Sequence, residues 1–126
     1  MDIESVRNFA LSLNENVTEE LFAKQWIAWR VCGKWFLLMQ LDAPEPRIAV
    51  KLPPDVATSL RDQYSGVRPA YHMNKTHWSD LYLNELDDKF VKMQITVSYQ
   101  MVQPSPPKGV AIRGKENMKK YITLKK

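Results

Sequence analysis

The densest group of chemically capable side chains in this sequence is the run AYHMNKTHW at residues 70–78. Its histidines, His72 and His77, could ligate a metal or transfer protons, and Lys75 could bind an anion. A spacing of five residues places the two histidines about 140° apart around a helix and on opposite faces of a strand. Neither arrangement matches the same-face spacing of a two-histidine metal site. The spacing therefore argues against a metal centre, and we expect no metal and no other cofactor.

Other routes to catalysis find equally little support in the sequence. Cys32, the single cysteine, falls at a predicted hairpin turn, where a small residue needs no catalytic explanation. The chain has four glycines, and they form neither a Walker loop, nor a G-x-G-x-x-G run, nor a G-x-S-x-G elbow. We therefore predict that the protein is not an enzyme.

Two interpretations of the run remain open. In the structural one, Asn74 caps a short turn, Trp78 fills the core between a sheet and a helix, and the two histidines hydrogen-bond to backbone carbonyls. In the binding one, Asn74, Lys75 and His77 face a groove and contact an anion or a phosphate group. Residue types and spacing alone fit both.

Local patterns predict the elements that position this run. Asp2 can cap a helix running to about Leu13, and a second helix begins at residues 53–55 with Gly66 as its C-terminal cap. Extended segments are predicted at residues 17–22, 26–32, 34–41, 47–52 and 81–83. Residues 86–102 alternate like a strand, but their number favours a helix. This order predicts a two-layer α+β domain, with helices packed on one face of an antiparallel sheet of about five strands.

Segments 26–32 and 34–41 are predicted to form a β-hairpin whose turn is Gly33-Lys34. In that hairpin we expect Trp29 and Trp35 to share one face and Trp26 to lie on the other. At least one tryptophan would then lie outside the core.

Charge is distributed unevenly along the chain. The net charge is +4, but residues 1–104 contribute −2 and residues 105–126 contribute +6. We therefore divide the chain into a domain at 1–103 and a basic C-terminal tail at 104–126. No apolar run approaches the roughly 20 residues that span a bilayer, and the first residues lack the features of a signal peptide. A cytoplasmic protein without membrane contact is expected.

Several segments together resemble a known family. The residues YHMNKTHW at 71–78 resemble the signature of the MmcQ/YjbR-like family. The segment VCGKWF at 31–36 resembles its hairpin. Residues 57–64 resemble its central helix, and residues 98–102 resemble its closing helix. The resemblance covers about residues 1–103 and implies a frataxin-like or secretion-chaperone-like α+β fold, with residues 86–102 helical. It also implies a bacterial, cytosolic protein, and a DNA-binding role through a double-wing arrangement has been proposed for the family.

Two functions from different classes follow. The leading hypothesis is a non-enzymatic DNA-binding protein whose weak binding is directed largely at phosphates. Its contacts would come from a binding group in the domain and a cationic arm in the tail. The group comprises Arg68, His72, Asn74, Lys75 and His77, and the arm comprises Lys108, Arg113, Lys115, Lys119 and Lys120.

The rival hypothesis is a module that binds a protein partner or a small ligand, with Trp26 or Trp35 on a groove or dimer face. A monomer or a weak homodimer is expected in either case.

Overall fold

The computed structural model describes residues 1–103. The tail cations predicted to bind DNA lie outside the described residues; they are Lys108, Arg113, Lys115, Lys119 and Lys120. No helix among residues 1–103 is long and apolar enough to cross a membrane.

The described chain folds into three helices and six strands. In chain order these are α1 (Ile3–Ser12), β1 (Thr18–Phe22), β2 (Trp26–Val31), β3 (Lys34–Gln40), β4 (Arg47–Lys51), α2 (Pro54–Gln63), β5 (Val67–Pro69), β6 (Trp78–Tyr82) and α3 (Asp88–Val102). The strands form one sheet in the order β1-β2-β3-β4-β6-β5, and every neighbouring pair is antiparallel.

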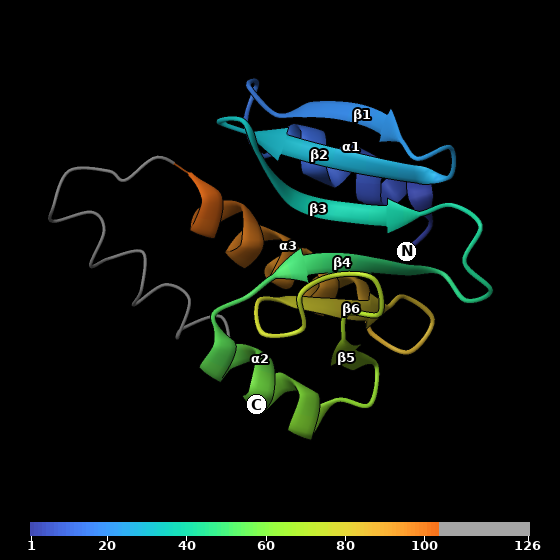
Figure 1. Ribbon diagram of the computed structural model, residues 1–126, viewed down its shortest axis with the longest axis vertical. Coiled ribbons are helices and arrows are strands. Elements are labelled where there is room, and N and C mark those ends of the chain that lie inside the picture. The colour runs from blue at the N-terminus through green and yellow to red at the C-terminus, as the bar shows by residue number, and fades with distance from the viewer. Residues whose placement is uncertain (104–126) are drawn as a thin grey trace, which may run out of the picture.

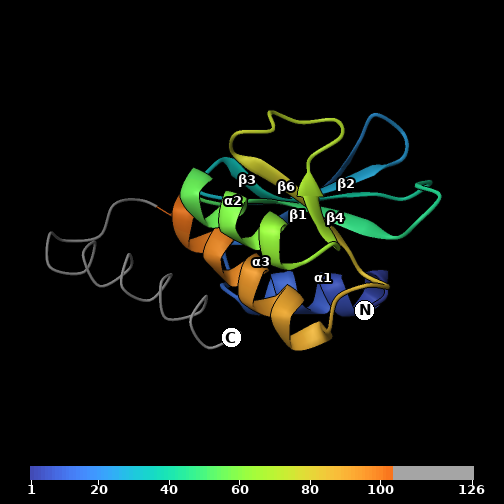
Figure 2. The same ribbon diagram turned by 90° about the horizontal axis from the view of Figure 1, so that it is seen from below.

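The helices all lie on one side of this sheet (Figures 1 and 2). We call that side the covered face and the other side, which is turned toward the reader in Figure 1, the open face. The prediction of a two-layer α+β domain is confirmed. The strand beyond the predicted five is β5, whose three residues are too few to show a periodicity.

The predicted starts of the first two helices are confirmed. The Asp2 carboxylate accepts a hydrogen bond from Ser5 N at 2.9 Å, which satisfies one of the free amides at the start of α1. Pro54 is the first residue of α2. The Asp87 carboxylate likewise accepts from Phe90 N at 3.1 Å and caps α3. Residues 86–102 are therefore mainly helical, and the alternation of apolar and polar residues within them does not form a strand.

Gly66 does not cap α2, and that prediction is wrong. The helix ends at Gln63, and the residue that follows it, Tyr64, is extended. A Cβ atom on Gly66 would lie 2.9 Å from Leu86 Cγ and 3.0 Å from Glu85 Cβ. Glycine fits this position because the side chains of Glu85 and Leu86 leave no room for a Cβ atom.

The β2–β3 turn consists of Cys32 and Gly33, one residue earlier than predicted. Both have positive φ angles, of 55° and 76°, as in the two-residue turns that match the twist of a hairpin. The turn pairs Val31 with Lys34. Cys32 is exposed.

This turn also corrects the predicted tryptophan faces. A two-residue turn pairs odd-numbered residues of one strand with even-numbered residues of the other. Trp35 accordingly pairs with Arg30 and lies on the open face, like Trp26. After an irregularity between Trp29 and Arg30, Trp29 pairs with Leu37, and it lies in the core under the covered face. Trp29 and Trp35 therefore lie on opposite faces.

A serine of α3 joins two strands where their pairing stops. The β3–β4 ladder runs from Met39–Ile48 to Leu37–Val50 and goes no further. Just beyond it, the Ser98 hydroxyl donates to Phe36 O at 2.5 Å and accepts from Lys51 N at 2.8 Å. Ser98 is fully buried, so it satisfies backbone groups that would otherwise lack a partner in the core.

Candidate nucleic-acid interface

The predicted binding run forms a loop at residues 70–77 that connects β5 to β6 and lies over the open face (Figures 1 and 2). Asn74 shapes it: its side-chain oxygen accepts from Thr76 N at 2.9 Å, and its backbone oxygen accepts from Trp78 N at 2.9 Å. The predicted turn capped by Asn74 is confirmed. Trp78 is only 9% exposed, but it packs on the open face with Leu38. It does not lie between the sheet and a helix, because its strand position points the other way.

Lys75 directs its ammonium group into the loop. The Nζ atom donates to Ala70 O at 2.9 Å and reaches Tyr71 O at 3.4 Å. Arg61 of α2 adds a second anchor, since its Nη2 donates to Lys75 O at 2.8 Å and Trp78 O at 3.1 Å. The lysine expected to meet a phosphate thus helps to close the loop on which it lies.

The two histidines are exposed and separate. The His72 ring packs edge-on against Trp26, with centroids 5.4 Å apart, and against Tyr71 at 4.6 Å. His77 accepts a hydrogen bond from Leu52 N through its backbone oxygen. Within residues 1–103 neither imidazole ring bonds to a backbone carbonyl, so that detail of the structural interpretation is wrong. The same residues contain no group of three or more potential metal-ligating side chains.

Beneath the loop lies a buried carboxylate, Asp80, which is 6% exposed. It accepts from Tyr71 N at 3.0 Å, and Arg47 Nε lies 3.7 Å away. Burial raises the pKa of Asp80, while the Tyr71 amide and the charges of Arg47, His72 and Lys75 oppose that rise. Asp80 therefore anchors the backbone of Tyr71, which is the first exposed residue of the loop.

Arg68, the other predicted phosphate contact, lies on β5 at the edge of the sheet. Its Nη2 pairs with Glu85 Oε2 at 2.7 Å, and its Nε donates to Ser65 O at 2.9 Å. Its guanidinium also stacks 4.0 Å from the Tyr82 ring centroid. A neighbouring carboxylate thus already compensates its charge.

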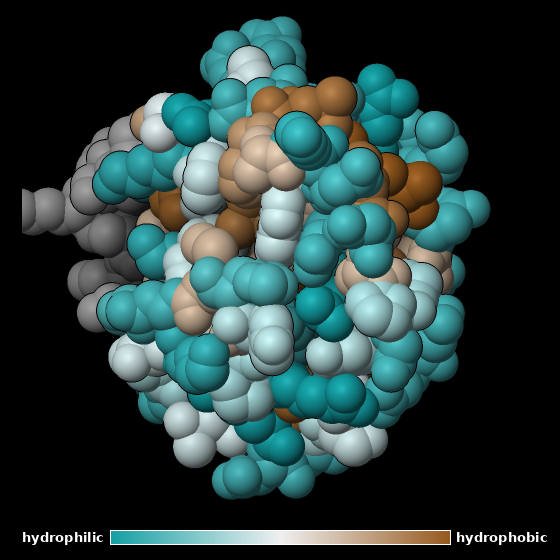
Figure 3. Space-filling model, turned by 45° about the vertical axis from the view of Figure 1, so that its right-hand side comes forward, coloured by the Kyte–Doolittle hydropathy of each residue, from teal (hydrophilic) through white to brown (hydrophobic). Residues whose placement is uncertain are grey.

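The rest of the open face carries an aromatic group that the histidine-rich run does not include. Phe22 stacks on Trp35, with ring centroids 4.8 Å apart, and contacts Trp26 at 5.8 Å. All three are partly exposed. Figure 3 shows the molecule's hydrophobic surface concentrated in the upper part of the view, among hydrophilic side chains, in colours that follow residue hydropathy and do not single out the tryptophans.

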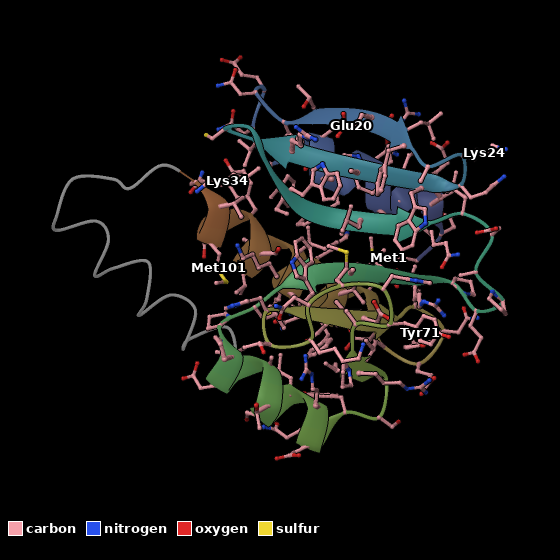
Figure 4. The ribbon with its side chains drawn as sticks, in the orientation of Figure 1. Met1, Glu20, Lys24, Lys34, Tyr71 and Met101 are labelled. Carbon is pink, nitrogen blue, oxygen red and sulfur yellow. The ribbon has the colours of Figure 1, made fainter. Side chains whose placement is uncertain are left out.

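Three cations that sequence reasoning missed accompany these rings: Arg30, Lys34 and Lys51. With Trp35 and Trp78 they line a surface pocket near the β2–β3 turn. Figure 4 shows Lys34 near that turn and Tyr71 toward the other end of the strands. The available signal was the position of Arg30 and Lys51 on strands otherwise rich in apolar residues. They are far apart in the sequence, so residue spacing alone does not indicate that they meet.

Comparison with known proteins identifies relatives of this chain. A family model described as YjbR matches residues 11–101. The chain is 43% identical over 56 residues to the uncharacterised protein YjbR of Escherichia coli K12, covering 44% of this chain and 48% of that one. It is 28% identical over 82 residues to the uncharacterised protein YbdF of Escherichia coli O157:H7, covering 64% and 67%. The matched part thus spans about half the length of the E. coli YjbR protein.

Two solved structures share the fold. A Deinococcus radiodurans protein superposes with a TM-score of 0.73 at 21% identity, covering 79% of this chain and 77% of that one. A Pseudomonas syringae protein gives 0.71 at 26% identity, covering 82% and 100%. At this identity the first of them supports the fold alone.

Proposed function

The chain belongs to the YjbR family, and from its own surface we propose that it is a non-enzymatic DNA-binding protein that contacts phosphates through the open face of its sheet. The observation that supports the proposal is the placement of cations on that face. Arg30 and Lys51 lie on that face beside the partly exposed ring of Trp35, and Lys34 borders the same pocket from the β2–β3 turn, although residues 1–104 carry a net charge of −2. Among the described residues, Lys34 and Lys51 have no ion pair, so both are available to a phosphate.

The open face also has the shape that such contacts need. No helix of the described residues covers it, and the loop at residues 70–77 lies over part of it (Figures 1 and 2), so an extended polyanion can approach the strands that the loop leaves open. The tail cations would add contacts with little dependence on sequence. We therefore expect weak binding, with a Kd of about 10⁻⁴ to 10⁻⁶ M at physiological salt, and a strong salt dependence.

A charge-reversal pair tests the assignment to this face. In a salt titration of duplex-DNA binding by the full chain, K34E/K51E should lower the affinity and flatten the dependence of log K on log salt by about 1.8, or 0.9 for each lost contact. The matched control K89E/K92E makes the same charge change on exposed residues of α3. Equal losses in the two variants would mean that net charge, not this face, governs binding.

A truncation tests the tail. Residues 1–104 should bind duplex DNA more weakly than the full chain, with a smaller salt slope. If neither form binds at low salt, the DNA-binding proposal fails.

The partly exposed aromatic group favours one alternative, a partner-binding module in which Phe22, Trp26 and Trp35 form the contact. Sedimentation of the full chain over a range of concentrations tests the self-association form of this alternative. A dimer that W26A dissociates would favour it, whereas a monomer at all concentrations would oppose it.

A further inference from the structure

The pocket near the β2–β3 turn brings cationic side chains and indole rings together. Its volume is about 270 Å³, and its lining is Arg30, Gly33, Lys34, Trp35, Lys51 and Trp78. Among the described residues, the lining contains three cationic side chains, two tryptophans and no acidic side chain. The volume falls just below the roughly 300–1,000 Å³ of pockets that enclose drug-sized ligands, but this pocket is shallow and open to solvent, so it can hold one small ring system with an attached anion against the surface.

The pocket exists because two strands separate there. The β3–β4 ladder ends at Leu37–Val50, and the Ser98 hydroxyl fills the gap from the covered side by bonding to Phe36 O and Lys51 N. On the open side, Trp35 of β3 borders one part of the pocket, and Lys51 and its strand partner Trp78 border another. The opening is thus part of the sheet's own geometry.

One wall of the pocket is held in place before any ligand arrives. Glu20 Oε1 accepts from Trp35 Nε1 at 3.0 Å and pairs with Arg30 Nε at 2.7 Å. Phe22 stacks on Trp35, and the Arg30 guanidinium lies 5.4 Å from the Trp35 ring centroid. A fixed aromatic group loses little conformational entropy when it binds a ring.

The charges of the pocket complement an anion. Glu20 compensates Arg30, but Lys34 and Lys51 have no ion pair within the described residues. A ligand with an aromatic ring for the partly exposed Trp35 and a phosphate for the two lysines would satisfy both features. A nucleotide has this composition, and its base can stack only when it is unpaired and free of the duplex.

We infer that this pocket is a subsite for one unpaired nucleotide of a single-stranded nucleic acid, with the base against the exposed part of Trp35 and the phosphate at Lys34 and Lys51. The inference rests on the proposed function and sharpens it, because it makes single-stranded nucleic acid the preferred ligand. Base–aromatic stacking does not depend strongly on sequence, so no sequence specificity is expected.

Affinity measurements with the full chain test the preference. Wild type should bind an oligothymidylate more tightly than a duplex of equal length. W35L, which keeps an apolar side chain but removes the ring, should weaken oligothymidylate binding at least about fivefold and change duplex binding less than twofold. W35F should retain most of the affinity. W26L is the matched control, since Trp26 is a partly exposed tryptophan of the same face that does not line the pocket.

A second titration tests the pocket without a polymer. Thymidine monophosphate should shift the indole N–H resonance of Trp35 saturably, and thymidine or inorganic phosphate alone should do so only at higher concentration. Thermal unfolding of each variant checks that it is folded.

The outcomes separate the two proposals. Duplex and oligothymidylate binding that are equally insensitive to W35L would overturn the subsite and leave DNA binding standing. Binding of the monophosphate at Trp35 without binding of any DNA would support the subsite and overturn the proposed function. No shift of Trp35 with the monophosphate would overturn the subsite.

Discussion

The two faces of the sheet are built from alternating residues of the same strands, yet they differ in what they contact. On the covered face Trp29, Phe36 and Leu37 are fully buried beneath the helices. On the open face Trp26 and Trp35 remain partly exposed beside arginine and lysine side chains. The difference separates two tasks: the covered face supplies most of the hydrophobic stabilisation, and the open face keeps charged and aromatic groups available to a ligand.

Adjacent residues of β3 give the largest expected contrast between the faces. Phe36→Ala should lower the free energy of unfolding by about 3–5 kcal/mol, because it removes a fully buried ring and leaves a cavity. Trp35→Ala should cost less than about 2 kcal/mol, because part of that indole is already in water. Chemical denaturation measures both. Equal losses would contradict the assignment of stability mainly to the covered face.

The arginine that ties the helical layer to the open-face loop should come next. Arg61 donates to the backbone oxygens of Lys75 and Trp78 and to Ser79 Oγ at 2.9 Å. Arg61→Met should cost about 2–3 kcal/mol, because these acceptors lose a charged donor. Arg61→Lys is the control that keeps the charge but not the forked geometry. Hydrogen exchange should rise most at residues 74–78, and a uniform rise across the sheet would contradict a local role.

Two lysines of the open face should behave in opposite ways. Lys75→Met should lower the free energy of unfolding by about 1 kcal/mol, because the Nζ bond to Ala70 O is lost, and should leave the salt slope of DNA binding unchanged. Lys51→Met should change stability little and reduce that slope by about 0.9. The reverse pattern would show that the loop, rather than the pocket, contacts phosphate.

The smallest expected effect concerns pH and the buried Asp80. Because its pKa is raised in the folded state, the folded protein binds more protons than the unfolded chain just above pH 3.8, so this residue's contribution to stability falls as pH rises through that range. Asp80→Asn removes that contribution and keeps an acceptor for Tyr71 N. Denaturation of both proteins from pH 3 to pH 7 should show the stability difference moving in favour of the variant as pH rises. A shift in the other direction would contradict a raised pKa.

Features encoded by neighbouring residues could be predicted from the sequence. The helix starts at Asp2, Pro54 and Asp87 depend on side chains within one turn. The cap at Asn74 is equally local. The three helices and the strands on the predicted segments then favour a two-layer α+β fold, which the structure has.

Features that depend on contacts between distant segments could not be predicted from the sequence. The face of Trp35 depends on the choice between two possible turn positions, and a shift in pairing moves a side chain to the other face. The Lys75 ammonium donates to the backbone oxygens of Ala70 and Tyr71, so its direction depends on the path of the whole loop, which Arg61 of α2 also contacts at Lys75 O. The pocket cations come from the β2–β3 hairpin and β4 and meet only in the folded sheet.

Indole N–H resonances test the central claim most directly, because tryptophans lie on both faces. Trp35 reports on the open face and Trp29, which is fully buried under the helices, on the covered face. When DNA is titrated at low salt into the full chain with ¹⁵N-labelled tryptophan, the Trp35 resonance should shift saturably while that of Trp29 stays in place. DNA binding that moves Trp29 as much as Trp35, or that leaves Trp35 unchanged, would contradict binding at the open face.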